Sequence, residues 1–420
     1  MAASRFPRSF VLAAAAIGLL ARLAFGLGYW TNERLNRDEV EYLSLARNLA
    51  AGHGYGYDEY VKSGPVEPFG RAPGYPVFLA LVGGGASYSE HVPAAVKVAQ
   101  AVVGAIGVFL IGVAASRMAG ARPAMAAAAI AALYPPLVWV SAYAYSEAVF
   151  WTLGLGVAIL LSRTFEEPRG SLWKWALASG AVVGVAILVR AATLLYVPLV
   201  GVWILWKRRW AAIPAFALGL VLVLTPWTIR NITHYGRFVL VASDGGVTFW
   251  TGNNSLATGE GDMAANPHLK LANQELRARH PGLNEEQMEP VYYQESFDWI
   301  RANPAAWIGL MFKKLFYLVV PIGPSYVQAH GARYYAASVI SVGLLVPLAA
   351  IGLWRLRGRR ERLAGMWLLA LAAVATCLVF FPQERFRIPV LDPSLILCAS
   401  GVWLPGRWAA ERKSAARTAA

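Results

Sequence analysis

The strongest constraint on this chain is a repeated pattern of apolar runs, each about as long as a bilayer is thick, separated by short charged or Gly/Pro-rich joints. Runs of this length predict membrane-spanning helices. The composition agrees, because 57% of the residues are hydrophobic and 15% are charged, whereas soluble domains are about a quarter charged. The sequence therefore predicts an all-α polytopic membrane protein.

The apolar pattern predicts about ten transmembrane helices, with ends defined to within a few residues. The predicted spans are residues 10–30, 93–115, 123–142, 147–162, 173–189, 192–206, 210–229, 335–354, 363–381 and 387–404. The first run follows a basic start, as a signal peptide would. It is longer than a signal-peptide core, it contains Arg22, and no clean Ala-x-Ala site precedes the polar segment, so we expect a retained helix.

Basic residues gather at the joints on one side of the predicted membrane, at Arg5 and Arg8, at 207–209 and at 355–362. The positive-inside rule places these joints and both termini in the cytoplasm. The net charge of +14 is thus dispersed over helix ends rather than collected on one soluble face. This distribution argues against a nucleic-acid partner.

With this orientation two large segments face outward. The predicted regions are a transmembrane module at 1–229 with a first outer loop at 31–92, an outward region at 230–334, and C-terminal helices with a cytoplasmic tail at 335–420. Residues 305–322 are apolar but carry Lys313 and Lys314 at their centre, where charge is costly in hydrocarbon. We expect an amphipathic helix in the outer interface there.

The acidic pair Asp38-Glu39 begins a predicted helix in the first outer loop, ending near Gly52. Asn36 is a candidate N-cap, and Glu39 stands three residues later, the spacing of a capping box. Helix capping alone explains the pair as well as catalysis does. Asp38 and Tyr42 share a face of this helix, which lies close to a membrane boundary.

Several arginines map to the same side of the membrane as Asp38. Carboxylates that face arginines suit a substrate with a hydroxyl to deprotonate and a phosphate to hold. A polar joint or interfacial snorkelling explains some of these arginines equally well. The candidate phosphate-binding residues are Arg71, Arg190, Arg230, Arg385 and Arg387.

A series of motifs recurs in order along the outward joints. They are Asp38-Glu39-x-x-Tyr42, Arg71-x-Pro73-Gly-Tyr-Pro76, Ser146-Glu147, Arg190, Pro226-Trp227-x-x-Arg230-Asn231, Gly252-Asn253-Asn254 with Ala257-x-Gly259, and Glu384-Arg385-Phe386-Arg387-x-Pro389. In order, spacing and side of the membrane, the set resembles the C-type glycosyltransferases of the protein-mannosyltransferase and aminoarabinose-transferase-like superfamily. The resemblance covers nearly the whole chain and is greatest to the bacterial branch without a large soluble C-terminal domain.

The resemblance implies a glycosyltransferase that moves a hexosyl or pentosyl group from a polyprenyl-phosphate donor to an acceptor hydroxyl on a lipid, a glycan or a protein. It implies an inverting displacement with Asp38 as the general base, and Glu39 and Glu147 as further acidic positions of the site. Arg71 matches a basic position that faces the lipid phosphate in relatives. The expected location is the cell inner membrane, with the active site facing the periplasm.

Further positions are predicted with less support. We expect substrate contacts from Tyr42, Tyr75, Trp250 and Asn253, although an interfacial aromatic belt explains Trp250 as well. Glu67 and His53 are candidate ligands of a divalent metal cation, the one cofactor predicted. Solvation in a loop explains Glu67 better, and lone histidines at unconnected spacings are poor evidence for a metal.

Two other functions use the same kind of chain. A transporter or flippase for a lipid or amphiphile would carry ionisable residues deep within its spans and matching halves. A lipid-linked oligosaccharide ligase would differ from a simple transferase only in donor length. The titratable residues of this sequence crowd the outer ends of the predicted spans, and the two halves do not resemble each other, which favours the transferase.

Overall fold

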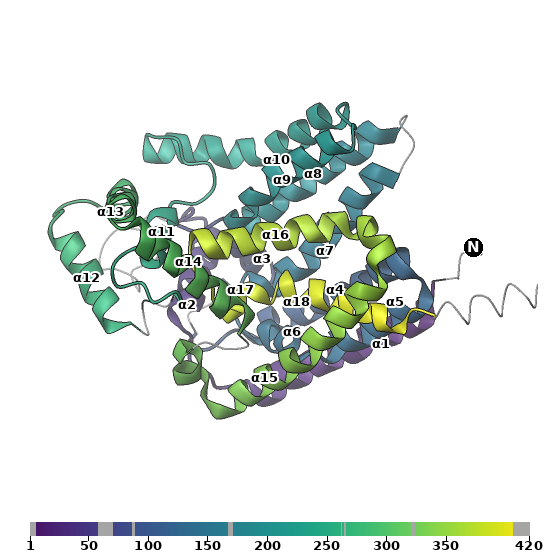
Figure 1. The fold of residues 1–420 in the computed structure, drawn as a ribbon. Helices are drawn as coiled ribbons and strands as arrows, with labels where there is room; N and C mark the ends of the chain where they lie inside the picture. The colour runs from purple at the N-terminus through teal and green to yellow at the C-terminus, as the bar shows by residue number, and fades with distance from the viewer. Residues whose placement is uncertain are drawn as a thin grey trace, which may run out of the picture.

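The computed structural model describes residues 6–57, 70–85, 89–166, 171–261, 263, 266–320 and 324–405, which fold into helices joined by turns (Figure 1). The long helices form an elongated bundle, and short ones gather at its ends. The elements are α1 (Arg8–Leu23), η1 (Ala24–Tyr29), α2 (Arg37–Ala50), α3 (Gly74–Leu81), α4 (Ala94–Ala119), α5 (Ala121–Leu133), α6 (Pro135–Trp139), η2 (Val140–Ala142), α7 (Glu147–Glu166), α8 (Leu172–Val189), η4 (Ala191–Leu195), α9 (Tyr196–Trp206), α10 (Ala212–Tyr235), α11 (Gly245–Gly252), α12 (Pro267–Ala278), α13 (Glu289–Ala302), α14 (Pro304–Val319), α15 (Pro324–Arg355), η5 (Arg357–Leu363), α16 (Ala364–Val379), α17 (Glu384–Arg387), α18 (Leu391–Ser400) and η6 (Gly401–Trp403).

The all-α membrane architecture is confirmed. Among the described residues, six helices are long and apolar enough to cross a membrane, and one bent pair would make a seventh. Three further predicted spans correspond to the shorter apolar helices 191–206, 364–379 and 391–403. The count of about ten therefore stays a prediction, since these three are shorter than a straight crossing requires.

The predicted span 123–142 is broken into α5 and α6, which are bent by 57°. Pro135 and Pro136 cause the break, because they lack the N–H groups that would bond the carbonyls of Ala131 and Ala132. Arg22 of α1 replaces those donors: its guanidinium lies 3.3 Å from each of these two oxygens. An arginine inside the first span therefore completes the hydrogen bonding of a different helix.

Helices α8 and α10 pack along each other through glycines. A Cβ atom at Gly180 would collide with the backbone of Phe216, and one at Gly219 would collide with the backbone of Leu177. Small residues at such crossings let helix backbones approach closely in lipid, where dispersion contacts rather than hydrophobic burial hold helices together.

Helices α11, α12 and α13 form a small unit at the left end of the bundle in Figure 1, opposite the N-terminus. The neighbouring helix α14 covers most of the segment expected in the interface. Its Lys313 is exposed, whereas Lys314 is buried and donates to Asn253 Oδ1 (3.1 Å) and to the carbonyl of Leu378 (2.9 Å). The two central lysines thus occupy different environments. The hydrogen bonds of Lys314 connect α14 to the end of α11 and to α16.

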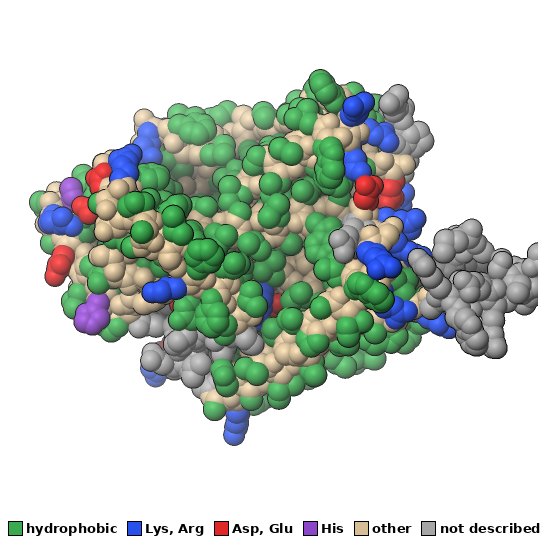
Figure 2. Space-filling model, in the orientation of Figure 1, with side chains coloured by type: hydrophobic (Ala, Val, Ile, Leu, Met, Phe, Trp, Pro, Cys, Tyr) green, Lys and Arg blue, Asp and Glu red, His purple; other side chains and the backbone are tan. Residues whose placement is uncertain are grey.

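The surface agrees with a membrane location. Figure 2 shows a hydrophobic belt across the middle of this face, with charged side chains collected at its two ends. Large apolar side chains on the spans are widely exposed, among them Leu20, Leu222 and Leu344. Exposed apolar surface of this extent on helices of membrane-crossing length is typical of contact with lipid. The chain is a multi-pass membrane protein.

Candidate active site

The site is built around the first turn of α2. The side chain of Asn36 accepts from the backbone N–H of Glu39 (3.2 Å), and Glu39 accepts from the backbone N–H of Asn36 (3.0 Å), which confirms the predicted capping box. The other oxygen of Glu39 accepts from the N–H of Ala144 at 2.9 Å. Glu39 is buried, and burial raises its pKa to about 7 although the backbone donors act against this shift. Glu39 therefore fastens α2 to the segment that precedes α7.

Asp38, which directly precedes Glu39 in this turn, is held between two arginines from distant segments. Arg71 Nη2 lies 2.5 Å from Asp38 Oδ1, and Arg385 forms an ion pair with Asp38 Oδ2. Arg71 also donates to Glu41, with its Nε and Nη2 at 2.9 and 2.6 Å from Oε2. About a fifth of the Asp38 side chain (21%) is exposed. The carboxylate thus keeps access to a reactant while both of its oxygens are engaged.

Burial raises the pKa of Asp38, but the opposing charges of Arg385 and Arg71 outweigh it and hold the pKa well below its usual range. Asp38 is consequently ionised throughout the physiological range. In this paired arrangement its affinity for a proton is low. The same two guanidiniums offer several N–H donors at one point, of the kind that bind carboxylates and phosphates.

A second acid–arginine pair lies beside the first. Arg190 follows α8 and places Nη1 2.8 Å from Glu147 Oε1 and 3.1 Å from Ser146 Oγ. The hydroxyl of Tyr42 donates to the same Ser146 Oγ at 3.4 Å. The guanidinium of Arg71 lies over the Tyr42 ring, 4.7 Å from its centroid. Tyr42 and Ser146 thereby connect the two pairs.

The ring of Phe386 contacts an arginine of each acid–arginine pair. The guanidinium of Arg385 is 5.1 Å from the centroid of the Phe386 ring, and that of Arg190 is 5.5 Å from it. Three predicted phosphate-binding residues, Arg71, Arg190 and Arg385, therefore gather around Asp38 and Glu147. They come from three segments that follow α2, α8 and α16 in sequence.

Two other predicted phosphate-binding residues have different partners. Arg230 donates to the carbonyl of Tyr55 at 3.0 Å, and the hydroxyl of Tyr55 donates to the carbonyl of Arg71 at 2.5 Å, so Arg230 supports the segment that carries Arg71. Arg387 is buried, and its ion-pair partners are Asp392 (2.9 Å) and Glu384 (3.5 Å). Neither arginine contacts Asp38.

The predicted substrate-contacting residues also divide into two groups. Tyr75 is buried beneath the site, edge-on to Tyr42 with ring centroids 4.8 Å apart. Trp250 is buried in the apolar core of the α11–α13 unit. Asn253 is buried too; it donates to the carbonyls of Phe249 and Val379. The structure brings Tyr42 and Tyr75 to the site and leaves Trp250 and Asn253 in the packing of the α11–α13 unit and its neighbours.

The residues that the structure describes do not form a metal site. No group of three or more His, Cys, Asp or Glu side chains suited to a cation occurs among them. His53 follows α2 and is exposed, and Glu67 lies outside the described residues. The carboxylates of the site face guanidinium groups, which occupy the positions that a cation would take. A divalent cofactor stays a prediction.

Sequence reasoning missed Glu41 and Tyr145. Glu41 lies three residues after Asp38, a spacing that places both on one helix face. The sequence could therefore have indicated that both carboxylates contact the same arginine. Tyr145 accepts from the side chain of Asn36 at 2.6 Å, and Arg385 lies over its ring at 5.0 Å. A tyrosine at a membrane edge resembles any member of an aromatic belt, so its contact with the site had no signal in the sequence.

The polytopic helical bundle that carries these carboxylates and arginines is similar in fold to solved oligosaccharyltransferases. The chain of the archaeal oligosaccharyltransferase AglB from Archaeoglobus fulgidus, solved with an inhibitory peptide and a dolichol-phosphate, matches 95% of this chain with a TM-score of 0.57 at 15% identity. The present chain spans 50% of that protein's length. The same oligosaccharyltransferase solved with Zn and sulfate matches 94% of this chain, with a TM-score of 0.57.

Residues 72–229, less than half of the chain, match the family model described as dolichyl-phosphate-mannose-protein mannosyltransferase. Over these residues the chain is similar to that family, and over most of its length it is similar to the solved oligosaccharyltransferase in fold. ArnT from Cupriavidus metallidurans bound to undecaprenyl phosphate aligns with 94% of this chain and 77% of its own, at 14% identity and a TM-score of 0.44. No curated protein matches the sequence.

Proposed function

We propose that this protein transfers a sugar from a polyprenyl-phosphate donor to an acceptor hydroxyl at the outer face of the cytoplasmic membrane. The observation that carries the proposal is the position of Asp38 between Arg71 and Arg385. A carboxylate and two guanidiniums at one point combine the two groups that the reaction needs: a base for the hydroxyl, and fixed positive charge for the phosphate that leaves.

The reaction is a single displacement. The acceptor oxygen attacks the anomeric carbon and forms the new glycosidic bond, while the bond between that carbon and the phosphate oxygen breaks. The bonding electron pair leaves with the polyprenyl phosphate, and Asp38 takes the acceptor proton. Because the nucleophile enters opposite the leaving group, the anomeric configuration inverts.

The two arginines make the strength of the base depend on the donor. A donor phosphate that draws Arg71 and Arg385 toward its own oxygens removes the charges that hold the pKa of Asp38 low. Asp38 then gains proton affinity in the complex that also contains the leaving group. Glu41 supports this movement of Arg71 from Asp38 toward the phosphate. It is a second carboxylate partner that keeps the guanidinium near the site. Donor binding therefore precedes deprotonation of the acceptor.

The Glu147–Arg190 pair supplies the rest of the donor site in this proposal. Arg190 adds a third positive charge for the phosphate, and Glu147 orients it through their 2.8 Å contact. Glu39 positions the reacting turn through the bonds to Asn36 and Ala144. The donor class is supported by the archaeal oligosaccharyltransferase of similar fold, which was solved with a dolichol-phosphate.

The test is the Asp38→Asn variant of the full chain, assayed by mass spectrometry of the glycolipids and envelope glycans of cells that depend on it. We expect loss of a sugar increment that the wild-type gene restores, with undecaprenyl phosphate still bound by the purified variant. Arg37→Lys on the same helix is the matched control, because Arg37 is exposed and pairs with Glu41 alone among the carboxylates of the site. Full transfer by Asp38→Asn would exclude Asp38 as the base.

A further inference from the structure

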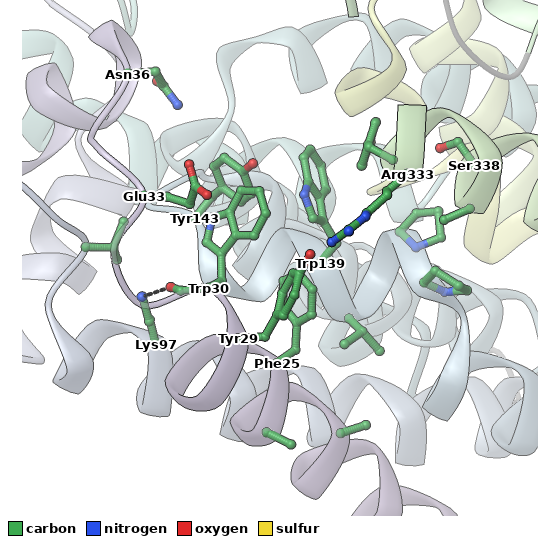
Figure 3. Close-up of a pocket in the computed structure, with 18 of the residues that line it drawn as sticks. Phe25, Tyr29, Trp30, Glu33, Asn36, Lys97, Trp139, Tyr143, Arg333 and Ser338 are labelled. Carbon is green, nitrogen blue, oxygen red and sulfur yellow. Dashed lines mark hydrogen bonds between the residues drawn. The ribbon is translucent and has the colours of Figure 1, made fainter. Parts of the chain in front are cut away.

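A large cavity lies next to the start of α2, separated from Asp38 by the Asn36–Glu39 cap. Its volume is about 1220 Å³, which exceeds the roughly 300–1,000 Å³ of most small-molecule sites. The cavity is enclosed by η1 and the end of α1, by the elbow between α5 and α6, and by α15 (Figure 3). A cavity of this size can hold the headgroup of a lipid together with part of its apolar chain.

The wall of the cavity is rich in aromatic side chains. Phe25 and Trp30 stack with their centroids 5.7 Å apart, and Trp30 lies 5.4 Å from Tyr143. Tyr29 and Trp139 complete this wall (Figure 3). Flat aromatic faces pack against the C–H faces of sugar rings and against alkyl chains, and they bury large areas while keeping a fixed shape.

A few polar groups stand among the apolar side chains of the lining. Glu33, Asn36 and Glu39 line the side nearest to α2, and Lys97 of α4 donates to the carbonyl of Trp30 at 2.5 Å. Figure 3 shows Arg333 extending from α15 toward the aromatic wall. A few polar groups set in an apolar wall provide the hydrogen bonds that orient a ligand.

A chain of contacts leads from the cavity to the reacting carboxylate. The ring of Tyr143 stacks on that of Tyr145, with centroids 5.1 Å apart and planes inclined by 15°. Tyr145 in turn contacts Asn36 and carries Arg385 over its ring, and Arg385 pairs with Asp38. A ligand in the cavity therefore lies one layer of side chains away from the proposed base.

We propose that this cavity binds the acceptor, and that the acceptor is a lipid with a hydroxyl-bearing sugar headgroup. The inference rests on the proposed transferase function. The walls belong to helices of membrane-crossing length, and Tyr29 at its margin is 61% exposed. A lipid can thus enter from the bilayer, place its sugar against the aromatic wall and direct a hydroxyl toward Asp38.

The position of the paired arginines favours the acceptor over the donor as the occupant of the cavity. The lining carries charges of both signs, Glu33 and Glu39 against Arg34, Lys97 and Arg333, and the ammonium of Lys97 is engaged by the Trp30 carbonyl. The paired arginines that suit a phosphate lie on the other side of the cap, at Asp38. Carboxylates are good acceptors for sugar hydroxyls.

The experiment uses a defined glycolipid as probe. The purified full chain is placed in phosphatidylcholine nanodiscs with monoglucosyl diacylglycerol that carries a photoreactive diazirine in one acyl chain, and the crosslinked peptides are mapped by mass spectrometry. We expect labelling of residues 24–30 and 133–143. Ala24→Trp, which fills the cavity from an exposed wall position, should reduce this labelling by about tenfold.

Ala16→Trp is the matched control, since Ala16 is exposed on α1 but does not line the cavity; its labelling should equal that of the wild type. Unlabelled glucolipid should compete, whereas undecaprenyl phosphate should not. Equal labelling in Ala24→Trp, or equal competition by undecaprenyl phosphate, would overturn the proposal. Asp38→Asn separates the two hypotheses, because it should keep the labelling and lose sugar transfer.

Discussion

Arg71 and Asp38, 33 positions apart in the chain, meet with Nη2 2.5 Å from Oδ1 at the start of α2. The contact joins the helix that carries the acidic pair to the segment that leads into α3. Arg71 is also shared with Glu41, so a single guanidinium is held by two carboxylates one helical turn apart. A phosphate that enters this site therefore competes with groups already in place, and its geometry must match the fork of the guanidinium.

Replacing Arg71 with lysine should weaken binding of the donor's phosphate, because an ammonium cannot make the paired hydrogen bonds of a guanidinium. We expect the Kd for undecaprenyl phosphate, measured by native mass spectrometry of the purified chain, to rise by about tenfold, or about 1.4 kcal/mol. Arg37→Lys, an exposed arginine of α2, should leave the Kd unchanged. An unchanged Kd in Arg71→Lys would remove Arg71 from the phosphate site.

The Glu147–Arg190 pair should behave as a unit in unfolding. Removing one partner of a buried pair leaves the other charge uncompensated, which costs about 3–5 kcal/mol in typical proteins. Glu147→Gln and Arg190→Met should each lower the melting temperature of the detergent-solubilised chain, and the double variant should lower it by less than the sum of the two. Additive losses would show that the 2.8 Å contact is not energetically coupled.

Glu39 should make stability depend on pH near neutrality. Its pKa is raised to about 7 by burial, so the folded chain binds a proton that the unfolded chain has released between about pH 5 and 7. Stability contributed by the protonated group is present at low pH and is lost as the pH rises through 7. The melting temperature should fall between pH 5.5 and 8.

The Glu39→Gln variant isolates this contribution, since other buried acids titrate in the same range. Its melting temperature should change less with pH than that of the wild type, and the difference between the two curves should develop from about pH 5 and level off above pH 7. Parallel curves would mean that Glu39 keeps its charge on folding.

Arg22 should be required for the elbow between α5 and α6. Arg22→Met leaves the carbonyls of Ala131 and Ala132 without its two hydrogen bonds, and each buried unsatisfied group costs about 1–3 kcal/mol. We expect a lower melting temperature and loss of glycolipid labelling in the adjoining cavity. In a Pro135→Ala, Pro136→Ala background, where backbone N–H groups return, the same substitution should cost less. An equal cost in both backgrounds would refute this explanation.

The sequence predicted much of the fold because lipid imposes simple requirements on a chain. Apolar length marked α4, α7, α8 and α10 within a few residues, and the spacing of Asn36 and Glu39 marked the start of α2. The break at Pro135 was not predicted, since a proline within a span often only bends it. The partner that stabilises the break, Arg22, lies more than a hundred residues earlier.

Part of the candidate site could also be predicted from the sequence. The predicted side of the membrane and the order of the motifs identified Arg71, Arg190 and Arg385 as site residues. These three arginines do gather around the acidic residues. The same reasoning could not separate them from Arg230 and Arg387, because a position on the outer side does not determine the direction of a side chain. Their partners are fixed by tertiary packing, which a linear pattern does not encode.

The bond between Arg22 and the α5–α6 elbow also bears on how the chain is assembled. The ribosome makes α1 long before α5, so Arg22 enters the membrane before its carbonyl partners exist. A central arginine costs about 2.5–3.5 kcal/mol on insertion scales. The first helix is otherwise strongly apolar, so it bears this cost alone until α5 and α6 bring the oxygens of Ala131 and Ala132. Part of the cost of placing the first hydrophobic segment in lipid is thus offset only by the third.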